Sequence, residues 1–383
     1  MCRIKEENIT LGPWDSTRAE KLGYEHFMLK EIHEQPKALR DTMGARLREE
    51  SVFLEEIGLK DEVLRSLEKI FIIACGTSYH AGLVGREALE ELTGLPVEVD
   101  IASEFCYRNP FMPANSLVIA ISQSGTTTDT LVAMRKCKAR GAKIIAITNV
   151  VGSTVAQEAD YTLYTRAGSE IAIASTKTYV TQLVALIMLA LQVGLVRKTV
   201  EETRLAQLIK GLHALPNQLE ELLGQASPIA ELARKYASHE HIFFIGRSLD
   251  YAIALEGALK LKEISYIHAE ACAAGEFKHG TLALVTEGVP IIALATQPHV
   301  FSQTLGNIQG ARDKGAKIIA VAKAGKDELG ELAHHLFEIP ATHRLLSPIL
   351  AVVPLQLFAY YAAVERGCDV DKPRNLTKSV MTE

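Results

Sequence analysis

An internal duplication constrains the fold of this chain more than any other feature of its sequence. Three segments recur in the same order, the first two at an offset of 172 residues and the third at 174. The pairs are Ile70–Ile73 with Ile242–Ile245, Ala102–Phe105 with Ala274–Phe277, and Gly141–Ala146 with the identical Gly315–Ala320. Chance similarity between apolar strands explains one such match but not three in order. The chain therefore contains two copies of one domain.

Each copy alternates short β-branched runs with longer stretches of helical periodicity. Ile70–Ala74, Leu117–Ile121 and Lys143–Thr148 are typical of fully buried parallel strands. Tyr79–Thr93 and Thr128–Arg140 have the spacing of helices. This predicts an α/β fold with two tandem doubly wound parallel sheets. The expected divisions are a mostly helical lead 1–59, a first domain 60–197, a helical linker 198–232, a second domain 233–366 and a tail 367–383.

Composition excludes several classes of protein. Of the 383 residues, 48% are hydrophobic and 23% charged, as in a soluble globular protein, and the net charge of −5 argues against a nucleic-acid partner. The six cysteines show no paired spacing and the N-terminus has no apolar leader, which favours the cytoplasm. Leu183–Val196 is too short to span a membrane and Ile349–Val364 is interrupted by Pro354, so both are expected to be core helices.

A loop rich in hydroxyl groups follows the strand Leu117–Ile121 and leads straight into a helix. It reads Ser122-Gln123-Ser124-Gly125-Thr126-Thr127. The start of a helix presents free N–H groups to an anion, and hydroxyls add donors. Ser and Thr are also ordinary helix caps, but the second copy has Ala295-Thr296-Gln297-Pro298 here. Hydroxyls kept in one copy only indicate a phosphate ligand. A second such loop, Cys75–Ser78, has also diverged from its counterpart, Arg247–Asp250.

The second copy and the tail carry candidate acid–base and amine groups. Lys260 and Glu263 share one face of a helix, where an exposed ion pair is the ordinary interpretation. His279 lies in a loop bounded by glycines, and Lys378 lies in the tail, where lysines are usually solvated. Together they match the isomerisation of a ketose phosphate to an aldose phosphate. A histidine opens the ring, a carboxylate moves a proton between C1 and C2, and a lysine forms an imine.

Six motifs together resemble glucosamine-6-phosphate synthase, the glutamine–fructose-6-phosphate aminotransferase, over about Gly23 to Glu383. They are CGTS (Cys75–Ser78), SQSG-T (Ser122–Thr127), ASTK (Ala174–Lys177), EGALKLKEISYIHAEA (Glu256–Ala271), GEFKHG (Gly275–Gly280) and DKPRNLTKSV (Asp371–Val380). The resemblance implies sugar-isomerase (SIS) domains of flavodoxin-like topology and a homodimer. It also implies fructose 6-phosphate, glucosamine 6-phosphate and glucose 6-phosphate as ligands, with no cofactor, no metal and no membrane partner.

The resemblance also implies a role for each candidate residue. Glu263 would carry the proton with Lys260 assisting, His279 of the other subunit would open the ring, and Lys378 would form the imine. The phosphate would be held by Ser122, Gln123, Ser124 and Thr127, and the sugar would be contacted by Gly76, Thr77, Ser78, Ile173 and Ser175.

The chain departs from the family pattern at three places. Thr126 stands where the family usually has glutamate, and Thr281 where it usually has proline. Only about 20 residues precede the similar region, where the family has a glutaminase domain, although Met1-Cys2 is similar to the start of that domain. We therefore expect isomerisation or ammonia-dependent synthesis, without glutamine as donor. A non-catalytic sugar-phosphate regulator and an amino-sugar-phosphate deglycase or deaminase remain alternatives.

Overall fold

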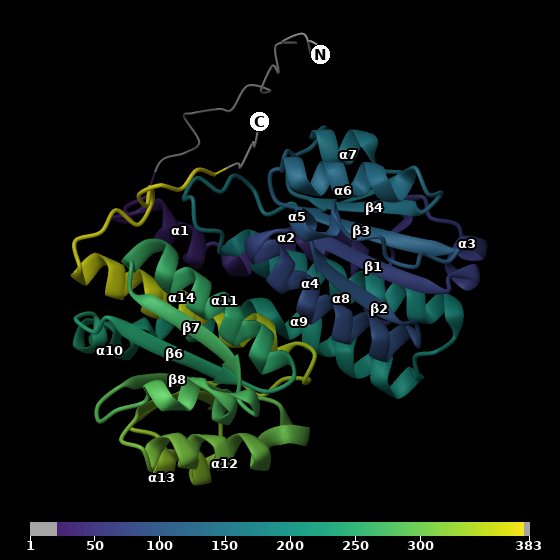
Figure 1. Cartoon of the computed structure of the whole chain (residues 1–383). Helices are drawn as coiled ribbons and strands as arrows, with labels where there is room; N and C mark the ends of the chain where they lie inside the picture. Colours follow the sequence, from purple (N-terminus) through teal and green to yellow (C-terminus); the bar gives the residue numbers. More distant parts are fainter. Residues whose placement is uncertain (1–20, 379–383) are drawn as a thin grey trace.

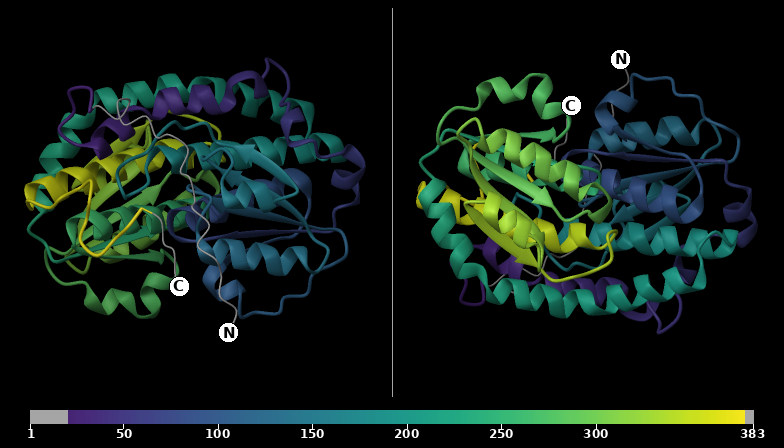
Figure 2. Two further views of the ribbon diagram at one scale, coloured as in Figure 1. Left: turned by 90° about the horizontal axis from the view of Figure 1, so that it is seen from above. Right: turned by 90° about the horizontal axis from the view of Figure 1, so that it is seen from below.

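The fold consists of two α/β halves of the same topology, which lie side by side (Figures 1 and 2). The computed structural model describes residues 21–378. Both sheets have five parallel strands, in the orders β2-β1-β3-β4-β5 and β10-β9-β8-β6-β7. Read from its other edge, the second order repeats the first strand for strand. The predicted α/β duplication is therefore confirmed.

The first half contains the predicted strands and the helices that cover them. Its strands are β1 (Lys69–Ala74), β2 (Val97–Ile101), β3 (Ser116–Ser122), β4 (Lys143–Thr148) and β5 (Tyr161–Tyr164). Its helices are α4 (Gly76–Thr93), α5 (Ala102–Phe105), α6 (Thr128–Lys138), α7 (Thr154–Glu158) and α8 (Lys177–Arg197). The strands β1 and β3 are buried along almost their whole length, because helices cover both faces of the sheet.

The second half follows the same plan with different loops. Its strands are β6 (His241–Gly246), β7 (His268–Ala273), β8 (Pro290–Ala295), β9 (Lys317–Lys323) and β10 (His335–Ile339). Its helices are α11 (Leu249–Ser265), α12 (Phe301–Arg312), α13 (Asp327–Leu332) and α14 (Ser347–Glu365). Where the first half has α5, the second has two 3₁₀ turns, Glu276–His279 and Thr281–Leu284.

The main hydrophobic core lies between the two sheets. The helices α4 and α8 from the first half meet α11 and α14 from the second, and all four contribute to one continuous cluster of buried residues. The helices α8 and α14 are long and apolar enough to cross a membrane, but most of their residues are buried inside the protein. They are core helices, as the sequence predicts. Each sheet has a smaller apolar cluster on its other face.

The remaining helices brace the two halves. They are α1 (Phe27–His33), α2 (Gln35–Met43), α3 (Asp61–Ser66), α9 (Glu202–Gly224) and α10 (Ala226–Tyr236). Figure 2 shows α9 running along one side of the molecule, where it packs against α2 and α14. After α14 the tail turns back, and its Asp371 carboxylate accepts the backbone N–H groups of Phe27 and Met28. The tail is thereby fixed to the start of α1.

Candidate active site

The hydroxyl-rich loop after β3 is already folded around its own side chains. The Ser122 hydroxyl accepts the Gly125 N–H at 3.0 Å and lies 3.0 Å from the Thr127 hydroxyl. Gly125 has a φ of +66°, and a Cβ there would lie 2.0 Å from the Ser153 hydroxyl oxygen. Only glycine fits this position. The loop therefore presents its polar groups at the carboxyl edge of the sheet, directly before α6.

A second loop from the neighbouring strand β1 lies at the same edge. Gly76, with a φ of +53°, begins α4, and Thr77 and Ser78 follow in its first turn. The Ser78 hydroxyl accepts a 3.0 Å hydrogen bond from the Gln182 side chain on α8. Ligands of parallel α/β sheets bind at this edge, between neighbouring loops. Two predicted binding loops thus lie on adjacent strands.

The helix α11 of the second half supplies a chain of charged groups that reaches the Thr77 loop. The Lys260 ammonium lies 2.5 Å from the Glu263 carboxylate and 3.4 Å from the Glu256 carboxylate, and it donates to the Thr77 hydroxyl at 2.9 Å. Lys260 is fully buried, so the interpretation as an exposed pair is wrong. Burial lowers the pKa of Lys260, but the two carboxylates outweigh it and raise that pKa above its ordinary value.

Glu256 links the two halves beneath this group. Its carboxylate accepts the Thr77 hydroxyl at 3.1 Å and lies 2.8 Å from Nδ1 of His80 on α4. The Glu256 side chain is completely buried, and its partners are the side chains of Thr77, His80 and Lys260. A buried carboxylate that is paired in this way holds its neighbours in place. It is therefore a supporting residue for Lys260 and Thr77.

The tail brings Lys378 to the same place from the far end of the chain. Its ammonium donates to the Glu170 carboxylate at 2.9 Å and to the Ala172 carbonyl at 2.6 Å, and its side chain is 25% exposed. The tail lysine is thus held by a carboxylate rather than simply solvated. Ile173 and Ser175 follow in the same segment, just before α8 begins.

These groups surround one cavity of about 270 Å³. It is lined by both loops, by Glu263, by Ile173 and Ser175, and by the tail: Cys75, Gly76, Thr77, Ser78, Ile121, Ser122, Gln123, Ser124, Thr127, Ile173, Ser175, Glu263, Leu376, Thr377 and Lys378. Lys260 lies behind this wall and touches it through Glu263 and Thr77. All but two of the predicted site residues therefore form or line one cavity.

His279 is the predicted residue that the fold does not bring into this cavity. It ends an exposed 3₁₀ turn of the second half and is not part of the cavity wall. The chain alone therefore assembles the phosphate loop, the carboxylate and the lysine, while the histidine faces solvent.

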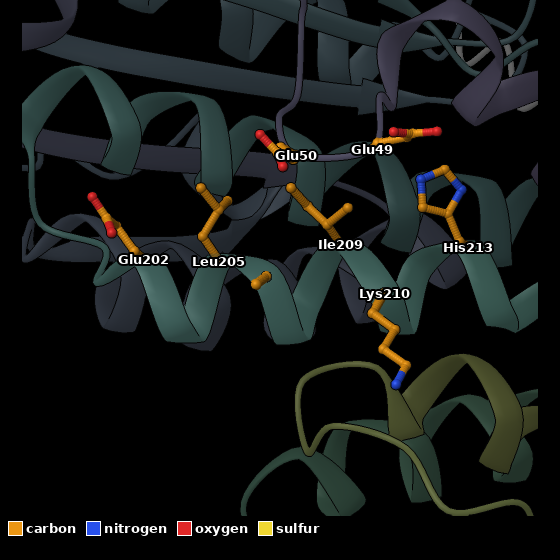
Figure 3. A pocket seen from close by; sticks show the side chains of 8 residues that line it. Glu49, Glu50, Glu202, Leu205, Ile209, Lys210 and His213 are labelled. Carbon is orange, nitrogen blue, oxygen red and sulfur yellow. The ribbon is translucent and has the colours of Figure 1, made fainter.

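A larger cavity of about 850 Å³ lies elsewhere and has the wrong charge for a phosphate (Figure 3). Glu49 and Glu50 face α9 across it, with Glu202 on α9 itself. Figure 3 shows Lys210 pointing away from the two loop glutamates. Three carboxylates repel an anion, and none of the predicted site residues lies there. Volume alone therefore does not identify the site.

Three residues that the sequence motifs did not single out hold the predicted ones in place. They are Glu170, Glu256 and His80. Two of them belong to the motifs described above or lie near one. Glu256 is the first residue of the α11 motif, and Glu170 lies four residues before ASTK. An acidic residue within an otherwise apolar or hydroxyl-rich run is the signal that could have found them.

Comparison with known proteins identifies the domain family of both halves. Residues 63–192 and 235–366 each match the SIS domain family. The chain is 54% identical to a glutamine–fructose-6-phosphate aminotransferase (isomerizing) of Symbiobacterium thermophilum and 53% identical to one of Caldanaerobacter subterraneus. Each match covers 97% of this chain and 61% of the relative, so the chain spans about three fifths of these relatives.

Two solved structures show the same architecture. The C-terminal domain of glucosamine-fructose-6-phosphate aminotransferase from Francisella tularensis superposes with a TM-score of 0.89 at 38% identity, covering 92% of this chain and 100% of that one. A glucosamine-6-phosphate deaminase from Thermotoga maritima superposes with a TM-score of 0.71 at 25% identity, covering 93% and 99%.

Proposed function

The chain belongs to the SIS domain family, with two tandem SIS domains homologous to the C-terminal isomerase part of glutamine–fructose-6-phosphate aminotransferases, and we propose that it isomerises fructose 6-phosphate. One observation carries the proposal. A single small cavity joins a hydroxyl-rich loop at a helix start, the carboxylate of Glu263 and the amine of Lys378. A regulator that only bound a sugar phosphate would need the first of these and not the other two.

Each part of the cavity has a proposed task. The hydroxyls of Ser122, Ser124 and Thr127 hold the phosphate at the start of α6. The other end of the open-chain sugar then lies between Glu263 and Lys378. Glu263 moves the proton between C1 and C2, and Lys378 forms an imine with the C2 carbonyl and withdraws electrons from the reacting carbons. Lys260 remains charged between its two carboxylates and attracts the negative charge that develops on the sugar oxygens.

The similarity to the aminotransferases also suggests a second activity, a cellular location and an oligomeric state. With ammonia as nitrogen source, the same imine chemistry yields glucosamine 6-phosphate. We propose a cytoplasmic homodimer in which the exposed His279 of one subunit serves the cavity of the other. The 25% identity to a deaminase, against 54% to an aminotransferase, favours synthesis over amino-sugar breakdown.

One assay tests the proposed function. The 383-residue chain is incubated with fructose 6-phosphate alone, with ammonium and with glutamine, while glucose 6-phosphate and glucosamine 6-phosphate are followed. We expect glucose 6-phosphate in every arm, glucosamine 6-phosphate with ammonium, and no glutamine-dependent product. A chain that binds fructose 6-phosphate and forms neither product would be a regulator. A chain that instead releases ammonia from glucosamine 6-phosphate and makes none would be a deaminase.

A further inference from the structure

The carboxylate of Glu170, which holds Lys378, is itself held by four further hydrogen bonds. Glu170 is fully buried, and its oxygens accept from the hydroxyls of Ser175 (3.0 Å) and Thr178 (2.7 Å) and from the N–H groups of Thr176 (2.9 Å) and Thr178 (3.2 Å). These donors stand at the start of α8, so the carboxylate caps that helix. The two N–H groups bind Oε1, and Oε2, which accepts both hydroxyls, also accepts Nζ of Lys378 at 2.9 Å. Because these hydrogen bonds fix its orientation, the Glu170 carboxylate is held in position to exchange a proton with Nζ of Lys378.

Imine formation needs such a partner, because an ammonium has no electron pair with which to attack a carbonyl. Resting on the proposed function, we propose that Glu170 is the catalytic residue that takes the proton from Lys378 and later returns it to the departing oxygen. The neutral Nζ attacks C2, a C–N bond forms and the carbonyl π electrons move to oxygen. That oxygen takes up one proton from the nitrogen that has just attacked and one from Glu170. The nitrogen lone pair then forms the C=N bond as the C–O bond breaks, and water leaves. Protonated amine plus ketone thus gives protonated imine plus water.

The charges around the pair fit this role. Burial raises the pKa of Glu170, but the ammonium of Lys378 and the hydrogen bonds outweigh it and hold that pKa below its usual range. Of the groups that lower the pKa of Glu170, Lys378 makes the largest contribution. When Lys378 gives up its proton, this contribution vanishes while burial remains, so the affinity of Glu170 for the proton rises at the moment of transfer.

A second carboxyl group, that of Glu31, lies close enough to Glu170 for the two to interact. Glu31 of α1 is only 2% exposed and accepts the Ala172 N–H at 3.3 Å. Its Oε2 has no hydrogen-bond partner among the described residues. Burial, and then the Glu170 carboxylate, raise the pKa of Glu31. The nearby Glu34 is occupied by Lys177 at 2.6 Å and Lys30 at 3.5 Å. Of the three carboxyl groups, Glu170 alone contacts Lys378.

Borohydride trapping of the imine tests the proposal separately from turnover. The rate at which fructose 6-phosphate becomes attached to the Lys378 peptide is measured for wild type, Glu170→Gln, Glu170→Asp and Glu34→Gln. We expect Glu170→Gln to slow trapping about a hundredfold or more and Glu170→Asp to restore part of it. Glu34→Gln removes a nearby carboxylate that does not touch Lys378, so it should trap like wild type. Sorbitol 6-phosphate, which has the phosphate but no carbonyl, checks that each variant still binds.

The outcomes separate this inference from the proposed function. Trapping by Glu170→Gln at the wild-type rate would overturn the inference, as would a wild-type protein that isomerises without any label on Lys378. A wild-type protein that does neither refutes both proposals. If Glu170→Gln no longer binds sorbitol 6-phosphate, Thr178→Val decides. It removes a donor to Glu170 and so should move the acidic limb of the trapping rate to higher pH; an unmoved limb overturns the inference.

Discussion

At the scale of single residues, the hydroxyls of the phosphate loop already bond one another without a ligand. Thr126 donates its hydroxyl to the Ser124 hydroxyl at 3.0 Å, and Ser122 and Thr127 are 3.0 Å apart. These contacts hold the donors close to the positions a phosphate requires, so little order has to be gained on binding. Gly125 makes this possible, since any side chain there would collide with Ser153.

Removing single hydroxyls from this loop should weaken the binding of 6-phosphorylated sugars. Ser124→Ala and Thr127→Ala each lose one hydrogen bond to a charged group, which costs about 1.5–3 kcal/mol, or about ten- to a hundredfold in affinity. Isothermal titration with fructose 6-phosphate measures the loss. Thr126→Ala is the comparison variant: Thr126 does not line the cavity and only orients Ser124, so its loss should cost less affinity than either test variant. Normal affinity in both test variants would place the phosphate elsewhere.

At the scale of elements, the second repeat has replaced its anion loop with a carboxylate of its own. Asp250, the counterpart of Ser78, accepts the Thr296 and Gln297 N–H groups at 2.7 and 3.3 Å. Those N–H groups follow β8, just as the phosphate loop follows β3. The side chain of the protein thus occupies the place that an anionic ligand would take. The N–H groups of this turn are thus satisfied although the second repeat has no hydroxyl-rich loop.

The buried Asp250 should give the folded protein a distinct dependence on pH. Burial raises the pKa of Asp250 to about 6, against 3.8 ordinarily, although the hydrogen bonds from Thr296 oppose it. A carboxyl whose pKa is higher in the folded state binds protons more readily when folded, so its contribution to stability grows as pH falls through this range. Relative to Asp250→Asn, wild type should therefore gain on the order of 1 kcal/mol between pH 7 and pH 5.

Urea unfolding of both proteins at a series of pH values measures this difference. The comparison between wild type and Asp250→Asn cancels the other titrating groups, which are common to both chains. A difference in unfolding free energy that stays constant from pH 7 to pH 5 would mean that Asp250 is ionised in the folded state throughout.

The sequence predicts the elements well because their signals are local. Buried parallel strands are continuous apolar runs, and the duplication shows which runs correspond. The grouping of the phosphate loop with Glu263 and Lys378 also follows, through strand ends and family motifs. The contacts that fix these groups cannot be predicted from local sequence patterns. Glu170 and Lys378 are 208 residues apart in the chain, and Thr77 and Glu256 are 179 residues apart. Burial of Lys260 depends on helices from both halves packing together, which no local pattern records.

At the scale of the whole molecule, the position of His279 is the decisive feature. The cavity draws on both repeats and on the tail, yet His279 stays in solvent on its exposed turn. A two-fold homodimer would give two identical shared sites, and homodimers are the commonest assembly of soluble enzymes. The family resemblance implies that the histidine then enters the cavity of the other subunit. The alternative is that this turn closes over the cavity of its own chain.

Mixing two inactive variants distinguishes these arrangements. His279→Ala and Lys378→Ala chains are each expected to be inactive, and their subunits are allowed to exchange. If His279 acts across the interface, a mixed dimer has one cavity that lacks both groups and one that has both, so isomerisation returns. With random exchange, half of the dimers are mixed and each has one intact cavity of two, so about a quarter of the wild-type activity is expected. If His279 acts within its own chain, every cavity in the mixed dimer lacks one group, and the mixture stays inactive although native mass spectrometry shows that exchange has occurred.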